Sequence, residues 1–380
     1  MPYAQRMRRF RDALGTGADF AFLPLSADLQ YLTGFPRDIP NFGRTIHPGE
    51  WAEGLWVSPN KPAVMILARM TAEFGAVGDT SEATLRILGD FDDPVALVRD
   101  VLRSFELSGR ARAAVSDTAR SETMIVIQEL VQGVRFVSAS NLIARQRVVK
   151  SEDEIDIMRH AGEITEAAYG AVLERLRHGM TELDLIEEIN YQLKAHGALG
   201  PSFTTALYNT GPGMPLNFNR LETWPRQLNP PCCVLFDFGA IFEGYCYDYG
   251  RTVAFGAPPA QFRIAHSLVM EAQSAGIAAL QAGAATCEQV DAAARTVIAG
   301  SGYGEAFRHR LGHSIGLDVH EPPFLTQGDA TPLREGMLFT VEPSILIDSG
   351  YSARVEDVVV ARPDGGEKLT NGYQDLYVVD

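Results

Sequence analysis

The stretch CCVLFDFGAIFEGYCYDYGRT, residues 232–252, decides how the second half of this 380-residue chain folds. The apolar run at 234–236 predicts a buried strand, and Asp237 interrupts it. A predicted turn at 243–244 starts a second strand that carries Asp248, eleven positions after Asp237. A hairpin of this length would bring the two carboxylates side by side. A carboxylate in an apolar strand is costly unless it is paired or bound to a metal.

Three further polar residues stand within or at the ends of predicted strands later in the chain. His313 lies in a segment that also holds His309 and His320, among glycines that would let backbone come close to a ligand. Glu342 ends an apolar run, and Glu356 interrupts a valine-rich strand. A cluster of three histidines in a chain that has eight indicates a site rather than scattered surface residues.

Taken one at a time, these residues have ordinary structural explanations. The two aspartates could bond to backbone amides or to Arg251, and Glu356 could pair with Arg354, while Asp357 is expected to face the opposite side of its strand. Taken together, four carboxylates and one imidazole suit two adjacent divalent cations such as Mn²⁺, Co²⁺ or Zn²⁺. Two such ions can activate a water for attack on a carbonyl or phosphoryl centre. The sequence therefore predicts a dinuclear metallohydrolase.

The composition argues against several other classes of protein. A formal net charge of −15 disfavours a nucleic-acid partner, which would call for a basic patch. No apolar run is long enough to cross a membrane, and the N-terminus lacks the apolar segment of a secretory signal, so we expect no membrane partner and a cytoplasmic location. The four cysteines include no CxxC pair and are expected to be buried free thiols.

The chain divides near residue 150 into two predicted domains. Residues 1–148 alternate short apolar strands with helices, which favours an α/β fold with a mixed sheet, and residues 149–380 combine long helices with the strands that carry the polar residues, an α+β pattern. Strands are predicted at 19–25, 55–59, 63–69, 85–91, 112–117 and 134–139, and helices at 93–107, 121–133, 151–177, 181–197, 260–282 and 287–300. Asp93 and Ser121 are predicted N-caps, and Ser151 with Glu154 forms a predicted capping box.

Six segments resemble the pita-bread metallopeptidase family, which includes methionine aminopeptidase, aminopeptidase P, prolidase and creatinase. The segments are LQYLTGF (29–35), VKSEDEIDIMRHAGEIT (149–165), DFGAIFEGYCYDYGRT (237–252), LGHSIGLDVHEPP (311–323), GMLFTVEP (336–343) and ARVEDVVVA (353–361). The resemblance spans essentially the whole chain and points to the creatinase and prolidase branch. It implies a creatinase-like α/β domain over 1–148 and a pita-bread catalytic domain over 149–380.

The resemblance also implies a metal-binding role for each matching residue. Asp237 would chelate one of two divalent ions per chain, and Asp248 and Glu356 would bridge both. His313 and Glu342 would bind the other ion. Mn²⁺ or Co²⁺ is expected before Zn²⁺. Creatinase lacks this ligand set, so creatine hydrolysis is disfavoured.

The same resemblance implies catalytic roles for four residues. Glu342 would act as general base on a metal-bridging hydroxide or water and then help protonate the leaving amine. His309 and His320 would hold the substrate and stabilise the tetrahedral intermediate, and Arg354 would contact the substrate or a nearby carboxylate. The implied enzyme is an Xaa-Pro dipeptidase or Xaa-Pro aminopeptidase that acts on dipeptides or short peptides, and the branch favours a homodimer.

Two departures from the family pattern bear on the substrate. Phe218, with asparagine on either side, stands where active peptidases carry a further histidine, and Leu346 stands where the family often has tyrosine. Candidate walls of an apolar proline pocket are Phe203, Tyr208 and Phe218, although core packing explains each equally well. An alternative function is a same-fold metalloenzyme acting on a small non-peptide amide or zwitterion, as in ectoine hydrolysis or dimethylsulfoniopropionate cleavage. A non-catalytic binding protein is a third reading, and the complete ligand set argues against it.

Overall fold

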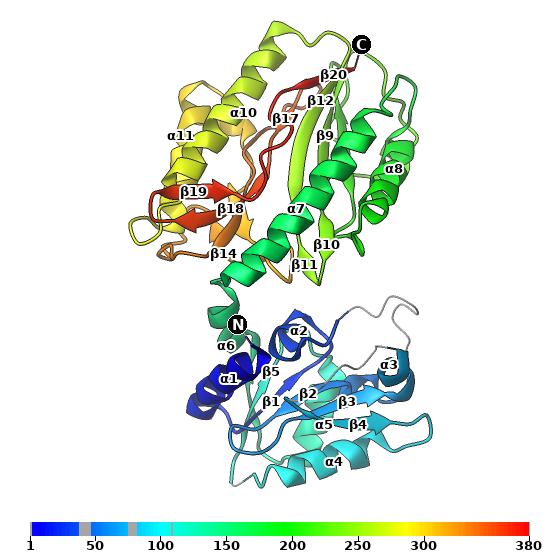
Figure 1. Cartoon of the computed structure of the whole chain (residues 1–380), viewed down its shortest axis with the longest axis vertical. Coiled ribbons are helices and arrows are strands. Elements are labelled where there is room, and N and C mark those ends of the chain that lie inside the picture. The colour runs from blue at the N-terminus through cyan, green and yellow to red at the C-terminus, as the bar shows by residue number, and fades with distance from the viewer. Residues whose placement is uncertain (1, 38–46, 75–81, 108, 380) are drawn as a thin grey trace. The chain divides into compact units, whose positions relative to one another are not determined.

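The structure is a computed structural model that describes residues 2–37, 47–74, 82–107 and 109–379. Contacts within the chain divide it into two compact units, Met1–Arg147 and Val148–Asp380 (Figure 1). Each unit has its own sheets and its own apolar core.

The first unit is built on one six-stranded mixed sheet in the order β4-β3-β2-β1-β5-β6. β1 runs parallel to β5 and antiparallel to β2, and β3–β4 and β5–β6 are parallel pairs. The strands are β1 (Phe20–Leu23), β2 (Gly54–Val57), β3 (Val64–Ala68), β4 (Thr84–Leu88), β5 (Arg112–Val115) and β6 (Arg135–Ser138). The helices are α1 (Tyr3–Gly17), α2 (Ala27–Thr33), α3 (Arg69–Phe74), α4 (Pro94–Ser104), α5 (Ser121–Leu130) and α6 (Ser140–Arg147), with a short 3₁₀ turn at Glu50–Ala52. The predicted mixed sheet is confirmed, and each of its strands overlaps a predicted one.

Of the two N-caps predicted for this unit, Asp93 is confirmed and Ser121 is wrong. The Asp93 side chain accepts hydrogen bonds from the backbone N–H groups of Val95 (2.9 Å) and Ala96 (3.2 Å), so it caps α4 as predicted. The prediction that Ser121 caps α5 is wrong, because Ser121 is already the first helical residue. Arg120 is extended and its carbonyl accepts the Thr123 N–H at 3.1 Å, so the helix begins one residue earlier than the serine suggested.

The second unit places its sheets between two pairs of helices (Figure 1). α7 and α8 contact β7, β8, β10 and β11, whereas α10 and α11 contact β14 to β17 and β19. The two larger sheets have the strand orders β20-β12-β9-β8 and β14-β13-β15-β18-β19, and smaller sheets join β11-β10-β7 and β16-β17. This is the predicted α+β arrangement.

The bounds of these elements follow the predicted ranges closely for the long helices. The helices are α7 (Glu152–Leu173), α8 (Glu182–Ala195), α9 (Arg220–Thr223), α10 (Ala260–Ala279) and α11 (Cys287–Gly300), with a 3₁₀ turn at Gly304–Ala306. The strands are β7 (Gly200–Pro201), β8 (Ala206–Thr210), β9 (Cys232–Phe238), β10 (Ala240–Phe242), β11 (Tyr245–Cys246), β12 (Tyr249–Phe255), β13 (Gly312–Ser314), β14 (Glu321–Leu325), β15 (Leu338–Val341), β16 (Ser344–Ile345), β17 (Ala353–Arg354), β18 (Asp357–Arg362), β19 (Gly365–Lys368) and β20 (Tyr377–Val379).

Helix α7 shows how the local sequence fixes this unit. The predicted capping box is present, with the Ser151 N–H donating to the Glu154 carboxylate at 2.9 Å. Ile155, Met158 and Ala161 recur at helical spacing and are fully buried. Burying an isoleucine or methionine side chain contributes about 1.5–3 kcal/mol, so this face holds the helix against the sheet.

The hairpin that opens the site differs from its predicted form. The turn at Glu243 and Gly244 is confirmed, since both residues have positive φ (48° and 82°) and β10 pairs with β11 across them. However, Asp248 is not carried by the returning strand, which ends at Cys246. The Tyr247 N–H still donates to the Ala240 carbonyl at 2.9 Å, after which the chain leaves this small sheet and enters β12 of another. Asp248 therefore lies in the junction between two sheets.

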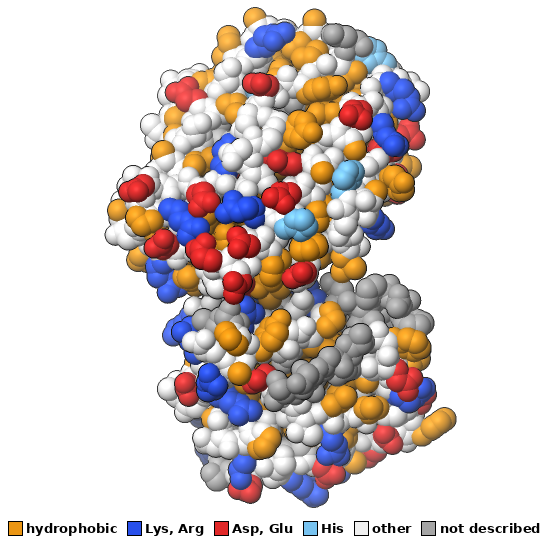
Figure 2. Space-filling view, viewed as in Figure 1, with side chains coloured by type: hydrophobic (Ala, Val, Ile, Leu, Met, Phe, Trp, Pro, Cys, Tyr) orange, Lys and Arg blue, Asp and Glu red, His pale blue; other side chains and the backbone are white. Residues whose placement is uncertain are grey.

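The cysteines, the helices and the surface charges bear on what the composition predicted for the whole chain. All four cysteines are buried and free, as predicted. Among the described residues, no helix combines the length and apolarity that a membrane span requires. Acidic and basic side chains lie side by side on the surface shown in Figure 2. Arg362, for example, pairs with Glu152 at 2.8 Å and with Glu367 at 2.9 Å.

Candidate metal centre

Asp237 reaches the candidate site from the middle of the sheet. It lies in β9 and pairs in register with Ala206 of β8 and Gly250 of β12, so these three residues share one face. Gly250 also forms a backbone bridge with Glu356, with hydrogen bonds of 2.9 and 3.3 Å. A Cβ at position 250 would lie 2.9 Å from the Cβ of Glu356 and 3.0 Å from its Oε2. Glycine at this position therefore lets the Glu356 carboxylate sit beside Asp237's strand.

Asp248, His313 and Glu356 bring their side-chain tips together. One ligand atom from each lies within 4.8 Å of the others, and all three residues are buried. Asp248 Oδ1 and Glu356 Oε2 are buried without any hydrogen-bond partner. Leaving an ionised oxygen in this condition is costly unless a proton or a cation satisfies it. The arrangement therefore fits a bound cation.

The imidazole of His313 is held in the form that binds a metal. Its Nδ1 lies 3.1 Å from the Ser314 carbonyl oxygen, which can only accept, so Nδ1 carries the proton and Nε2 keeps its lone pair. Nε2 lies 3.6 Å from Asp248 Oδ2 and 3.5 Å from Glu342 Oε1. Burial, with a smaller effect of His320, lowers the pKa of His313 to about 3, so the ring is neutral at pH 7.

The four carboxylates of the site repel one another in a poorly hydrated space. Burial raises the pKa of Asp237, and burial together with neighbouring carboxylates raises the pKa of Asp248 and of Glu356 well above the usual range. Burial raises the pKa of Glu342 to about 7. Such a cluster is stable with all its charges only when cations balance it. Divalent metal ions would supply that balance.

Arg354 supplies a positive charge to this cluster from the protein itself. Its Nη1 lies 2.5 Å from Asp237 Oδ2, so the sequence-based alternative of an Arg354–Glu356 pair is replaced by a pair with Asp237. A hydrogen bond of 2.9 Å from the Arg354 N–H to the Thr252 hydroxyl fixes the backbone of β17 against β12. The nearby carboxylates raise the pKa of Arg354 against the opposing effect of its burial.

The other two histidines occupy different positions relative to His313. The His320 ring centroid lies 4.2 Å from that of His313, and burial lowers the pKa of His320. His309 is tied elsewhere: Nε2 contacts the Ser344 hydroxyl at 2.5 Å and Nδ1 contacts the Arg310 carbonyl at 2.7 Å. Burial lowers the pKa of His309 to about 4. His320 therefore borders the candidate metal centre directly, whereas both ring nitrogens of His309 already have partners.

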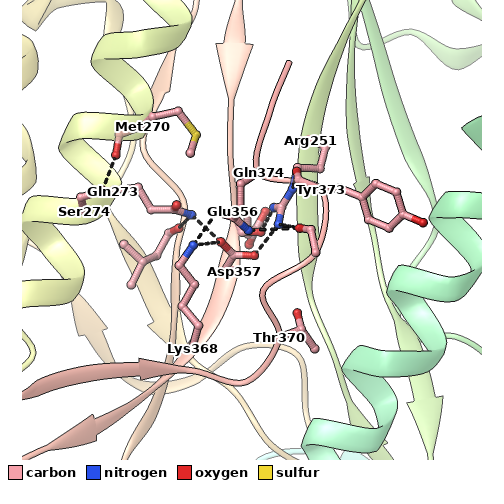
Figure 3. A network of polar contacts seen from close by, with 12 residues as sticks. Arg251, Met270, Gln273, Ser274, Glu356, Asp357, Lys368, Thr370, Tyr373 and Gln374 are labelled. Carbon is pink, nitrogen blue, oxygen red and sulfur yellow. Dashed lines mark hydrogen bonds and ion pairs between the residues drawn. The ribbon is translucent and has the colours of Figure 1, made fainter. Parts of the chain in front are cut away.

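Asp357 and Arg251 form a separate ion pair beside the site. Arg251 Nη2 donates to Asp357 Oδ1 at 2.7 Å, so the alternative in which Arg251 neutralises the two aspartates does not describe its partners (Figure 3). Asp357 has no measurable exposure to solvent and turns away from Glu356, as its position one residue later in the strand predicted.

Three residues that support the site carry only weak signals in the sequence. Gly250 makes room for Glu356, and a Cβ at Gly312 would collide with the carbonyl oxygen of Thr340. The Thr340 hydroxyl accepts the His313 N–H at 3.1 Å and donates to Glu342 Oε1 at 3.3 Å, so it joins two of the candidate ligands. A threonine inside the apolar run LFTV was the available signal, because a buried hydroxyl needs a partner.

The aromatic residues proposed as pocket walls lie partly on the same face. Tyr208 pairs with Leu235, two positions along β9 from Asp237, and thus shares the face of that carboxylate. Burial and the charge of Asp237 raise the pKa of Tyr208. Phe218 is 68% exposed and packs edge-on against Tyr208, with ring centroids 5.5 Å apart. Leu346 donates its N–H to the Ala306 carbonyl at 3.0 Å.

Comparison with known proteins agrees with this geometry. A model of "Metallopeptidase family M24" matches residues 156–363, more than half of the chain, and a "Creatinase/Prolidase N-terminal domain" model matches residues 6–149. The chain belongs to metallopeptidase family M24. The resemblance to the creatinase and prolidase branch and the predicted pita-bread fold are confirmed.

Relatives of this M24 protein carry related names. An Xaa-Pro dipeptidase from Lactobacillus helveticus is 30% identical over 367 residues, which cover 95% of each chain. An Xaa-Pro dipeptidase from Lactobacillus delbrueckii subsp. lactis is 38% identical over 249 residues, which cover 63% of this chain and 64% of the relative. A solved prolidase from Thermococcus sibiricus superposes over the full length of both chains with a TM-score of 0.87 and 27% identity.

Proposed function

We propose that this M24 protein is a dinuclear metal-dependent hydrolase that cleaves the bond before proline in dipeptides or short peptides. The observation that carries the proposal is the convergence of Asp248, His313 and Glu356, whose ligand atoms lie within 4.8 Å of one another. The unpartnered buried oxygens of Asp248 and Glu356 and the free lone pair of His313 fit a divalent cation. The full ligand set would be Asp237, Asp248, His313, Glu342 and Glu356.

The chain's own residues would orient the substrate and move protons. When bound, two adjacent divalent cations supply Lewis acidity and lower the pKa of a water. Glu342 would take a proton at a carboxylate oxygen and return it to the leaving amine. His320, beside His313, would donate a hydrogen bond to the oxygen of the scissile carbonyl. Arg354 would hold Asp237 in place, and His309 would reach a substrate only by giving up its contact with Ser344.

The preference for proline rests on the relatives and on the aromatic side of the site. The relatives named Xaa-Pro dipeptidase share the family and much of the length of this chain. Tyr208 lies on the face of Asp237, and Phe218 packs against it with most of its ring exposed. An apolar wall of this kind suits the proline ring, which has no N–H to satisfy once it is in a peptide bond.

The second candidate function is hydrolysis or lysis of a small non-peptide amide or zwitterion. One observation favours it: the exposed side chain at position 218 is a phenylalanine, which can neither donate a hydrogen bond nor carry a proton. A substrate smaller than a peptide would need fewer polar contacts there.

The test is an assay of metal-reconstituted protein. The purified protein is stripped of metal, reloaded with Mn²⁺ or Co²⁺, and offered dipeptides and tripeptides with proline at the second position, beside matched peptides without proline. Release of proline from the dipeptides alone supports a dipeptidase, and cleavage of the tripeptides supports an aminopeptidase. Bound metal without turnover of any peptide would contradict the peptidase proposal and direct the search to small amides and zwitterions.

Three sequence-based predictions go with this proposal. We propose Mn²⁺ or Co²⁺ as the working metal, a homodimer as the assembly, and the cytoplasm as the location. Metal analysis of protein purified without chelator, analytical ultracentrifugation and cell fractionation test these predictions independently of the peptidase assay.

A further inference from the structure

Asp357, directly after the candidate ligand Glu356, is the centre of a buried polar network. Its Oδ1 accepts a hydrogen bond from Arg251 Nη2 at 2.7 Å. Its Oδ2 lies 3.1 Å from Lys368 Nζ and accepts a hydrogen bond from Gln273 Nε2, also at 3.1 Å. Figure 3 shows the three donors reaching Asp357 from different elements: Arg251 from β12, Gln273 from α10 and Lys368 from the end of β19. We call these four residues the Asp357 network.

Every N–H group of the Arg251 guanidinium has an acceptor, either Asp357 or a backbone carbonyl. Nε donates to the Tyr373 carbonyl, and Nη2 donates to Asp357 and to the Gly372 carbonyl, at 2.7–3.2 Å. Nη1 donates to the carbonyls of Gly250 and Glu356 at 2.8 and 2.7 Å. A guanidinium has five N–H donors, so all of them are engaged. Two of the five hold the bridge between Gly250 and Glu356, which is the contact that places the Glu356 carboxylate in the site.

Gln273 links the two strands that end in candidate ligands. Its Nε2 donates to the Val341 carbonyl at 3.2 Å and to Asp357 Oδ2 at 3.1 Å. Val341 and Asp357 are paired across β15 and β18. Glu342 directly follows Val341 and Glu356 directly precedes Asp357, so a single buried amide fixes the strands where both carboxylates leave them.

We infer that the Asp357 network positions Glu342 and Glu356 to bind the same divalent cation. The inference rests on the proposed metal function, and it makes Arg251, Gln273 and Lys368 positioning residues that act through backbone and through Asp357. Each carboxylate in the site repels its neighbours, so the unliganded side chains gain by moving apart. The network opposes that movement from the opposite side of the strands. Partners of this kind typically change metal affinity or activity 10–100-fold when they are removed.

A purely structural role for the network makes a different prediction. If the network only neutralised a buried charge, its loss would lower the stability of the metal-free protein and leave the intrinsic affinity for metal unchanged. A positioning role lowers the affinity for metal in protein that is still folded. The two roles are therefore separated by a metal-binding isotherm recorded on protein shown to be folded by circular dichroism.

The main variant is Gln273→Leu, with Gln192→Leu as its matched control. Gln192 is also a buried helical glutamine, and its amide bonds Glu188 in α8 at 2.7 Å. Calorimetric titration of each metal-free variant with Mn²⁺ should show about 10–100-fold weaker binding of at least one ion in Gln273→Leu and wild-type affinity in the control. Equal isotherms for wild type and Gln273→Leu would overturn the inference.

Lys368 provides a second test should Gln273→Leu fail to fold. Its side chain is 20% exposed, so Lys368→Met disturbs packing less, and Lys368→Arg keeps the charge. We expect weaker Mn²⁺ binding in Lys368→Met and recovery in Lys368→Arg, and wild-type binding in Lys368→Met would count against the network. If the wild-type protein itself takes up no divalent cation, the proposed function fails and the inference with it. If the wild type binds two ions and no network variant changes their affinity, only the inference fails.

Discussion

Glu356 and Asp357 are neighbours in the sequence and are both almost fully buried, yet they lie in opposite electrostatic surroundings. Asp357 receives donors from Arg251, Gln273 and Lys368 on both of its oxygens. Glu356 Oε2 has no hydrogen-bond partner, and burial together with the neighbouring carboxylates raises the pKa of Glu356. One residue step along a strand therefore separates a satisfied buried charge from an unsatisfied one.

This difference indicates which buried carboxylates are completed by the protein's own donors and which would need an external cation. A buried carboxylate is tolerated when protein donors complete its shell, as they do for Asp357. The unpaired oxygens of Asp248 and Glu356 are a cost that only a proton or an external cation removes. We therefore expect the Asp357 side of the strand to hold the backbone in place and the Glu356 side to accept a metal ion.

Removal of a candidate ligand should have the largest effect. Asp248→Ala is expected to abolish peptide hydrolysis and to remove binding of at least one ion, because the site loses a carboxylate that would contact both cations. Activity assays and metal analysis of the reconstituted variant check this outcome. Glu163→Ala, an exposed change on α7, serves as the control and should behave as wild type. Full activity of Asp248→Ala would exclude the dinuclear interpretation.

Loss of Arg354 should strongly destabilise the metal-free protein. Arg354→Met leaves Asp237, whose side chain is 16% exposed, without its cation, and breaking an ion pair from one side costs up to about 3–5 kcal/mol when the pair is buried. Urea unfolding in the presence of a chelator measures this free energy. Arg354→Lys keeps the charge and should recover part of the loss. A metal-free Arg354→Met protein as stable as the wild type would show that Asp237 does not depend on this pair.

Substitution of His320 distinguishes a residue that contacts the substrate from one that binds metal. His320→Gln should lower kcat by about 10²–10³-fold if the ring stabilises the developing negative charge on the substrate oxygen. Its metal content should stay at the wild-type level, since His320 contacts the ring of His313 without belonging to the converging ligand atoms. Parallel loss of metal would place His320 among the ligands instead.

Glu182 gives the smallest expected effect and an independent check of the cost of a buried carboxylate with one unbonded oxygen. It is 1% exposed, one of its oxygens lacks a hydrogen bond, and burial raises its pKa to about 7 from the ordinary 4.5. Well below pH 4.5 the carboxyl is neutral in both folded and unfolded states. As the pH rises from about 4.5 to about 7, the unfolded chain releases the proton first, so the folded wild type loses stability. The loss is complete above pH 7.

Glu182→Gln removes this dependence. The variant should lie within about 0.5 kcal/mol of the wild type at pH 4.5 and exceed it by about 2 kcal/mol at pH 8, as measured by urea unfolding at both values. The difference between the two proteins cancels the titration of the metal-site carboxylates, which both retain. A pH-independent difference would mean that Glu182 has the same pKa in the folded and unfolded states, so that its pKa is not raised by folding.

Much of this architecture was predictable because local patterns determine it. Strand alternation, the capping box at Ser151 and the five candidate ligands depend on residue type and spacing, and the segments that carry them were visible in the sequence. Ser121 and Asp248 were misplaced by a small shift, because the start of a helix and the end of a strand depend on backbone hydrogen bonds to other parts of the chain.

The partners of Arg251 and Arg354 could not be predicted from the sequence, because the tertiary structure determines them. The sequence placed Arg251 near the aspartates and Arg354 near Glu356, since these residues are close in the chain. In the fold, Arg251 pairs with Asp357 and Arg354 pairs with Asp237, across 106 and 117 positions. Gln273 joins the network from a helix whose pattern shows only an amphipathic surface, so nothing in its local sequence indicated a link to two strands.

The most direct test of the account is crystallography of the protein loaded with Mn²⁺, using anomalous diffraction to locate the ions. The account predicts two anomalous peaks about 3.5–4 Å apart, enclosed by Asp237, Asp248, His313, Glu342 and Glu356. It also predicts that Asp357 keeps its contacts with Arg251, Gln273 and Lys368 in the loaded protein. A single peak, or peaks held by other residues while these five carry no metal, would contradict it.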